Sequence, residues 1–276
     1  IVTLPDLPPK GDVSDWIRAG GTAADLNRIS EQAPILDSRF PIMENRENQE
    51  TEVTLTPMAD FLREPPENIG WVVDRTLPAA GVSILGAKPK VGKSTLARNL
   101  ALCVARGEPF LGRATTAGPV LYFALEEKRA EVQKHFALMG AKEEPIYVHV
   151  DPMPQPHEAL AVLRAAIKRH SPALVIVDPL FKFIQLRDAN DYVEVTRVLD
   201  PFMQLARESG CHIAFVHHAG KQERMGGDEI LGSTAIFGVV DTAMLMKKRE
   251  NVRTLYSIQR YGDDLPETVI ALDPTS

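Results

Sequence analysis

The segment 87–95, Ala-Lys-Pro-Lys-Val-Gly-Lys-Ser-Thr, has the residue types and spacing of a loop that binds phosphate groups. It follows the apolar run 81–86 and precedes the helical run 96–104. A strand, a loop and a helix in this order direct backbone N–H groups and the positive end of the helix dipole at one point, which suits a triphosphate. The sequence therefore predicts a nucleotide-binding loop, or P-loop. Its expected residues are Ala87, Lys88, Pro89, Lys90, Val91, Gly92, Lys93, Ser94 and Thr95.

Within this loop, Lys93 is expected to reach the β- and γ-phosphates of ATP, and Ser94 to hold Mg²⁺. One position departs from the usual pattern G-x-x-x-x-G-K-[ST], because Ala87 replaces the first glycine. If that position needs a positive φ, an alanine there is strained, and we expect the preceding Gly86, together with Pro89, which fixes the loop, to relieve the strain. The alternative, an incidental turn before a helix, leaves the Gly-Lys-Ser-Thr sequence without a packing role.

Asp178 is a second candidate, since it ends the buried apolar run 173–177. In P-loop nucleotidases an aspartate at such a strand end holds Mg²⁺ beside the P-loop serine or threonine. We therefore predict that Asp178 and Ser94 share one magnesium ion. The alternative is a carboxylate that caps the turn at Pro179.

Two acids, Glu126 and Glu127, follow the apolar run 120–125. A carboxylate at the end of a strand beside the P-loop can position and polarise the attacking water. Glu126 is the candidate for that role because it comes first after the run. Glu127 is the first-turn acid of the following helix, where the helix dipole favours negative charge. In the alternative interpretation both acids are helix caps.

His217 and His218 follow a third apolar run, 213–216. Adjacent side chains on a strand point to opposite faces, so at most one of these histidines faces the nucleotide. The rest of the sequence has no histidine or cysteine at ligand spacing, which disfavours a zinc site. A core histidine is the alternative to a residue that senses the γ-phosphate.

Two polar segments follow strand ends: 182–190 comes shortly after Asp178, and 219–230 comes directly after His218. The first carries Lys182 and Arg187, and the second is rich in glycine and carries Lys221 and Arg224. Such cations can contact the phosphates of single-stranded DNA. The alternative is an ordinary solvated surface, since few aromatic residues accompany them.

The elements that must position these residues alternate between buried strands and amphipathic helices. This alternation predicts an α/β fold with a mainly parallel sheet, helices on both faces and an antiparallel C-terminal extension. The expected strands are 82–85, 120–125, 146–150, 174–177 and 212–216, the helices are 94–106, 128–139, 156–170 and 190–209, and the late strands are 242–247, 253–259 and 268–272.

The composition is that of a soluble globular protein, with 44% hydrophobic and 25% charged residues and a net charge of −6 over 276 residues. The two cysteines lie in apolar runs, and the sequence has no apolar stretch long enough for a membrane span, so we expect a cytoplasmic protein. Residues 1–56 are expected to form an arm or linker, and residues 57–276 the ATPase domain. The first residue is Ile, which suggests a processed chain or a piece of a longer one.

These motifs, in this order, resemble the RecA-like ATPase family, and in particular the RepA-like branch of hexameric replicative helicases. The segments that carry the resemblance are 88–95, 121–126, 175–178 and 215–218. The resemblance implies that Glu126 activates water, and that His218 links the γ-phosphate to a DNA-binding loop at 221–230. It also implies a homo-oligomeric ring in which a basic residue of the next subunit completes the ATP site.

Arg260 is the best candidate for that basic residue in trans, because it follows a late strand in Gln-Arg-Tyr-Gly. A surface arginine in a hairpin turn is the alternative. Related proteins often carry arginine at the position of Leu231, so in this chain that position is not expected to supply the basic residue in trans. Residues 8–16 and the following Gly20-Gly21 resemble the segment that closes a Toprim primase domain, which implies a primase domain upstream in a primase–helicase fusion.

The resulting hypothesis is an ATP-driven, ring-forming DNA helicase of phage, plasmid or integrated-element type, with ATP and Mg²⁺ as cofactors. A RecA-like recombination or regulatory ATPase that binds DNA or protein without unwinding is the main alternative. A small-molecule kinase and a non-catalytic nucleotide-binding module are further alternatives. Native mass and the response of ATP hydrolysis to single-stranded DNA discriminate among them.

Overall fold

The computed structural model describes residues 13–32, 55–65, 69–153, 158–184, 191–218 and 238–271. The chain divides into two units, Ile1–Pro66 and Glu67–Ser276. Most of the segments expected to contact DNA, 185–190 and 219–230, lie outside the described residues, as do Leu231, residues 8–12 of the Toprim-like segment and most of the arm 1–56.

The first unit contains the helices α1 (Val13–Arg18), α2 (Ala23–Gln32) and α3 (Met58–Phe61). Thr22 and Asp25 form two reciprocal hydrogen bonds at the start of α2. The Asp25 N–H donates to Thr22 Oγ1 at 3.2 Å, and the Thr22 N–H donates to Asp25 Oδ2 at 3.3 Å. This is a capping arrangement that satisfies first-turn N–H groups. The Trp16 ring packs so closely on Gly21 that a Cβ atom there would lie 2.4 Å from it. α3 buries none of its residues.

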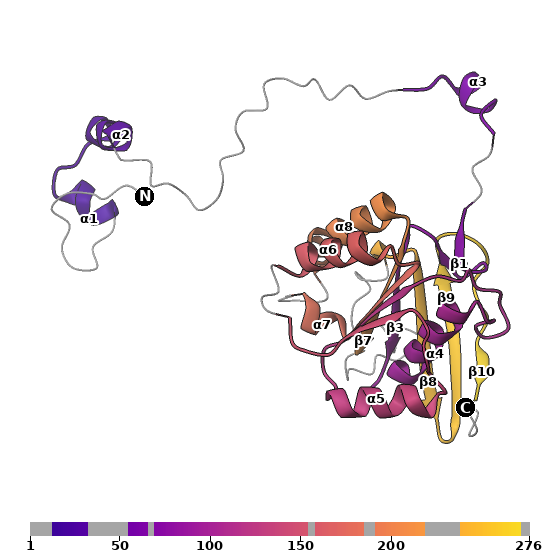
Figure 1. Ribbon diagram of the computed structural model, residues 1–276. Helices are drawn as coiled ribbons and strands as arrows, with labels where there is room; N and C mark the ends of the chain where they lie inside the picture. Colours follow the sequence, from indigo (N-terminus) through magenta and orange to yellow (C-terminus); the bar gives the residue numbers. More distant parts are fainter. Residues whose placement is uncertain are drawn as a thin grey trace. The chain divides into compact units, whose positions relative to one another are not determined.

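The second unit is built on an eight-stranded sheet, within the described residues, in the order β10-β9-β8-β3-β7-β6-β4-β5. The strands from β8 to β5 in this order are parallel, while β9 and β10 are antiparallel to their neighbours (Figure 1). The strands are β3 (Val82–Ala87), β4 (Val120–Ala124), β5 (Ile146–His149), β6 (Leu174–Asp178), β7 (His212–His218), β8 (Thr242–Arg249), β9 (Val252–Gln259) and β10 (Thr268–Ile270), with a separate small pair of β1 (Trp71–Val73) and β2 (Leu77–Pro78).

Helices cover both faces of this sheet. In Figure 1, α6 and α8 lie together on one face and α4 and α5 on the other. Alternate residues of one strand enter the two cores: Val175 and Val177 of β6 pack in the first, and Leu174 and Ile176 in the second. The predicted α/β fold, with its antiparallel C-terminal extension, is confirmed. The helices are α4 (Lys93–Arg106), α5 (Arg129–Leu138), α6 (Ala159–His170), α7 (Leu180–Phe183) and α8 (Tyr192–Ser209).

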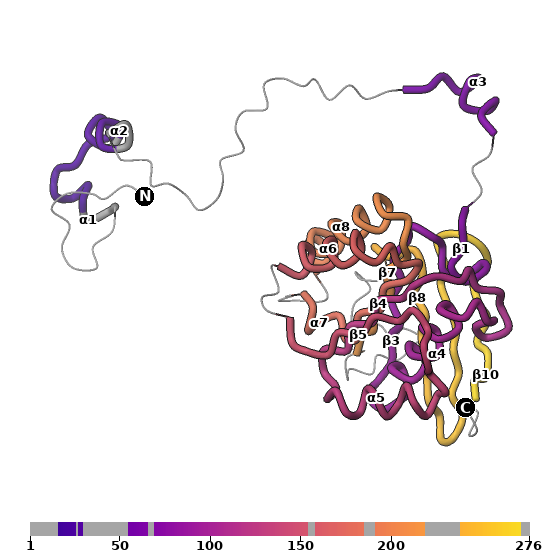
Figure 2. Tube along the Cα trace, viewed as in Figure 1, coloured from indigo at the N-terminus to yellow at the C-terminus, as the bar shows by residue number. Residues whose placement is uncertain are grey.

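The helix α4 leaves β3 through the P-loop, as the chain trace shows (Figure 2). It begins after Gly92 and ends at Gly107, both of which have a positive φ, 113° and 70°. Gly107 thus terminates the helix in the left-handed conformation that glycine adopts without strain.

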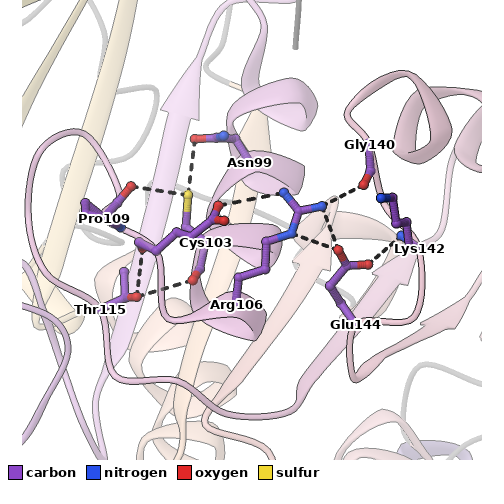
Figure 3. A network of polar contacts seen from close by, with 9 residues as sticks. Asn99, Cys103, Arg106, Pro109, Thr115, Gly140, Lys142 and Glu144 are labelled. Atoms are coloured by element: carbon purple, nitrogen blue, oxygen red, sulfur yellow. Dashed lines mark hydrogen bonds and ion pairs between the residues drawn. The ribbon is translucent and has the colours of Figure 1, made fainter.

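A polar network fastens the C-terminal end of α4 to the segment before β5 (Figure 3). Arg106 Nε donates to Glu144 Oε1 at 2.8 Å, and Arg106 Nη2 donates to Gly140 O at 2.7 Å. The N–H of Lys142 donates to the Glu144 carboxylate at 2.6 Å and, together with Arg106, lowers the pKa of Glu144 to about 2. Since α4 carries the P-loop lysine at its other end, this network stabilises the helix that supports the candidate site.

Both cysteines, Cys103 and Cys211, are free and buried, and burial raises the pKa of each thiol. Among the described residues, no helix combines the length and apolar character needed to cross a membrane.

Candidate functional site

The carboxyl ends of four neighbouring parallel strands bring the candidate residues to one edge of the sheet. Ala87 at the end of β3 is paired with His218 at the end of β7, and Ala124 at the end of β4 is paired with Asp178 at the end of β6. The Leu125 N–H donates to Asp178 O at 2.8 Å, so Glu126 leaves the sheet directly beside the aspartate. In open α/β sheets, ligands bind outside the carboxyl ends of the strands, and this edge is such a place.

The P-loop turns without strain at Ala87. This residue is the fully buried last residue of β3, and its φ is not positive. The positive φ angles of the loop belong to Lys90, at 63°, and Gly92, at 113°. Alanine is therefore compatible with its position, because the turn that demands left-handed backbone lies later in the loop.

Lys93 lies at the centre of the site and is only 4% exposed. Its Nζ donates to Ala87 O at 2.9 Å and to Lys88 O at 3.1 Å. Burial lowers the pKa of Lys93, while the nearby carboxylates of Asp178 and Glu126 oppose that shift. The lysine thus shares one electrostatic environment with the two acids expected from the sequence, and its ammonium group is held by neutral carbonyls that an anionic phosphate can replace.

Asp178 contacts the P-loop serine. Ser94 is close enough to this carboxylate to lower its pKa, and the buried Tyr122 hydroxyl donates to Asp178 Oδ2 at 3.4 Å. Burial raises the pKa of Asp178, and the nearby Ser94 hydroxyl partly offsets this. Magnesium takes few protein ligands and completes its shell with phosphate oxygens and water, so a hydroxyl beside one carboxylate fits this ion. The described residues contain no larger cluster of metal-ligating side chains. The role of Ser94 and Asp178 as magnesium ligands stays a prediction.

The two acids after β4 lie in different surroundings. Glu127 is bound by Arg98, which is 2% exposed, and lies 3.4 Å from His135 Nδ1. Glu126 is exposed, and its Oε2 lies 3.2 Å from Nε2 of His218. Glu127 therefore compensates a buried cation, whereas Glu126 is accessible to a water molecule at the open edge of the sheet.

The two histidines at the end of β7 point to opposite faces, as their strand position predicts. His217 is buried and packs on the Phe181 ring of α7, with 4.8 Å between ring centroids. Burial lowers the pKa of His217 to about 4, so its ring is neutral at pH 7. His218 is partly exposed and reaches Glu126. The assignment of His218 as the γ-phosphate sensor stays a prediction.

Arg260 lies at the other end of the parallel strands, beside their first residues rather than their last. It follows β9, whose last residue Gln259 is paired with Thr242, the first residue of β8. Its Nη1 lies 3.6 Å from Asp241 Oδ1, and its Nη2 donates to Gly238 O at 3.1 Å. Because β8 is parallel to β3, this end of β9 is far from the P-loop of the same chain, and Arg260 cannot serve that site in cis.

Sequence reasoning missed Arg253, at the other end of β9. Its Nε donates to Val91 O of the P-loop at 2.8 Å. It also lines a cavity of about 210 Å³ that borders the first turns of α4. The sequence offers no signal for this contact, since it depends on β9 lying two strands from β3 in the sheet, with β8 between them.

Comparison with known proteins adds one finding. Residues 47–224 match a family model described as AAA domain. The matched range covers more than half of the chain and contains the P-loop, Glu126, Asp178 and His218. Arg253 and Arg260 lie beyond it.

Proposed function

The chain belongs to the AAA domain family and carries a P-loop ATPase domain, and from this premise we propose that it is an ATP-hydrolysing motor that assembles into a ring and acts on single-stranded DNA as a replicative helicase. The observation that carries the ATPase part of the proposal is the convergence of the P-loop, Asp178 and Glu126 at the carboxyl ends of β3, β6 and β4, where both carboxylates act on the charge of Lys93. This is the set of groups that phosphoryl transfer to water requires.

The nucleotide is held by three parts of the site. The N–H groups at the start of α4 and the Lys93 ammonium bind the phosphates. Ser94 and Asp178 would hold Mg²⁺, which neutralises charge on the phosphate oxygens when bound. The cavity beside Thr95 has an apolar lining with few polar groups, which suits the sugar and base of the nucleotide.

Hydrolysis is assigned to Glu126 and His218. Glu126 orients a water molecule toward the γ-phosphate and accepts its proton. His218 donates a hydrogen bond to the same carboxylate. A movement of Glu126 toward the nucleotide would therefore change the position of His218 at the end of β7. The segment 219–230 follows His218 directly, which supports a coupling of nucleotide state to DNA contact through that segment.

Ring assembly is supported by the opposite positions of Arg260 and the P-loop. A head-to-tail interface brings one edge of a subunit against the other edge of its neighbour, and closes into a ring. In such a ring Arg260 of one subunit would stabilise the transition-state charge at the ATP site of the next. A ring also accommodates the net charge of −6. In a ring that encloses a DNA strand, only the segments lining the central channel, 182–190 and 219–230, need to carry basic residues. A primase domain upstream is part of the same proposal.

One experiment tests the proposal as a whole. Native mass is measured with and without ATP, and the ATPase rate with and without single-stranded DNA. We expect a ring of several subunits and a DNA-stimulated rate. An ATPase that forms filaments or stays monomeric and does not unwind duplex DNA would instead support the recombination or regulatory alternative. ATP binding without turnover would indicate a non-catalytic module.

A further inference from the structure

The C-terminal strands contact the P-loop through one side chain. Arg253 lies on β9, paired with Lys248 of β8 and Ile270 of β10. Its Nε donates to Val91 O at 2.8 Å, and it passes so close to Gly92 that a Cβ there would lie 3.6 Å from the same nitrogen. The loop's N–H groups converge on the phosphates, so a side chain that binds a loop carbonyl leaves those N–H groups free for the nucleotide.

The guanidinium group of Arg253 has donors left over. Arginine carries five N–H groups, and the Nε–H uses one of them on Val91. In the described part of the chain, neither Nη atom makes a hydrogen bond or ion pair. The residue lines the 210 Å³ cavity, so unused donors and an open volume occur at the same place.

The character of the cavity identifies which part of a nucleotide these donors meet. The cavity borders the first two turns of α4 at Thr95 and Asn99, and Lys93 is not among the described residues that line it. Its walls are largely apolar, with Leu111, Met139, Met246 and Ile270 among them. Such walls suit a sugar and a base, whereas phosphate oxygens would lose hydration without compensation there.

We propose that Arg253 is a nucleotide-contacting residue supplied in cis: its Nε holds the P-loop through Val91 O, and its Nη atoms bind the sugar-and-base end of the nucleotide. The inference rests on the proposed ATP site and adds to it a residue outside the segment that matches the family model. It also ties the β8–β9 hairpin to nucleotide occupancy, since one side chain contacts both.

The test measures, by titration calorimetry on the full chain, the dissociation constants of ATP and of inorganic tripolyphosphate. The variants are Arg253→Met, which keeps the length of the stem, and Lys248→Met as the matched control. Lys248 is the exposed cross-strand neighbour of Arg253, so the control removes the same charge from the same hairpin. We expect Arg253→Met to weaken ATP binding roughly tenfold or more, as the loss of charged hydrogen bonds does, and to weaken tripolyphosphate binding by a smaller factor, through loss of the Val91 hydrogen bond alone. Lys248→Met should leave both constants within roughly threefold.

A second variant keeps the test decisive if Arg253→Met does not fold. Arg253→Lys retains the charge but cannot serve Val91 and the cavity at once, so ATP binding should fall by an intermediate factor. Unchanged ATP binding in either variant, or equal losses for ATP and tripolyphosphate, would overturn the assignment. Absence of ATP binding by the unaltered protein would instead contradict the proposed ATP site itself.

Discussion

The Nε2 atom of His218 lies 3.2 Å from Oε2 of Glu126, although the two residues are 92 positions apart in the chain. The contact joins the ends of β7 and β4, on either side of β6, which ends in Asp178. A carboxylate held in this way is oriented before a substrate arrives, and pre-orientation of this kind is what a water-activating group requires.

The first prediction concerns this carboxylate. Glu126→Gln should leave ATP affinity nearly unchanged and slow hydrolysis by about 10² to 10⁴-fold, because the amide cannot accept the proton of the attacking water. Single-turnover hydrolysis and equilibrium binding measure the two effects separately.

Glu127→Gln is the matched control. It should lower the midpoint of thermal unfolding, because it leaves Arg98 buried without its carboxylate partner. If Glu127→Gln abolishes hydrolysis in a folded protein while Glu126→Gln does not, the roles of the two acids are reversed.

The second prediction concerns Lys93. Lys93→Ala should abolish measurable ATP binding or turnover, since the proposed phosphate site loses its central cation. Lys134→Ala, which removes an exposed lysine of α5, should have no such effect. Retention of normal ATP turnover by Lys93→Ala would exclude the P-loop as the nucleotide site.

The third prediction uses Arg260. If Arg260 completes the ATP site of a neighbouring subunit, as proposed, Arg260→Ala should reduce turnover in the assembled protein only. Mixing Arg260→Ala protein with Lys93→Ala protein should restore part of the activity that each lacks alone. The reason is that some interfaces then combine an intact P-loop with an intact Arg260. No recovery in a demonstrably mixed ring would contradict the action in trans.

The fourth prediction is a pH dependence of stability that originates at His212. In the folded protein His212 Nδ1 donates to Pro78 O at 2.7 Å, and Nε2 accepts from the Ser83 hydroxyl at 2.8 Å, so the neutral ring is fully bonded. Burial lowers the pKa of His212 from 6.5 to about 4. The unfolded state therefore binds more protons between these values, and the free energy of unfolding falls as the pH drops from about 6.5 toward 4.

Urea titrations at pH 7 and pH 5 measure this effect, which amounts to about 2 kcal/mol for one such group. The buried His217, whose pKa is also lowered to about 4, adds to the loss in the same direction. Glu144, with a pKa of about 2, contributes only as the pH falls below the ordinary glutamate value of 4.5. His212→Asn should be less stable at pH 7 and show a shallower decline. An equally steep decline in that variant would assign the effect to other groups.

The fifth prediction tests the network at the end of α4. Glu144→Gln should destabilise the protein by about 1 kcal/mol, since the amide still accepts one hydrogen bond but loses the charge that pairs with Arg106. ATP affinity should change little, because the network lies at the far end of the helix from Lys93. A double-mutant cycle with Arg106→Met isolates the pair.

Much of this architecture is local in origin and was readable from the chain alone. Continuous apolar runs alternating with amphipathic helical runs predict a covered parallel sheet, and polar residues after those runs predict a site at its carboxyl edge. The strand–loop–helix around Lys93 needs no distant contact to be recognised, because its glycine spacing and flanking patterns lie within one short segment. The same kind of local signal predicts roles for Asp178, the last residue of a buried strand, and for Glu126, the first acid after another.

Only the tertiary structure decided which of two adjacent residues faces the site and which side chains meet across strands. Glu126 and Glu127 differ because Arg98 of α4 is buried beside one of them, and His217 and His218 differ because α7 covers one face of β7. The contact of Arg253 with Val91 and the remoteness of Arg260 both follow from the position of β9 in the sheet, two strands from β3. Strand order is set by the packing of whole elements, and the residue pattern within one strand does not predict which strand pairs with it.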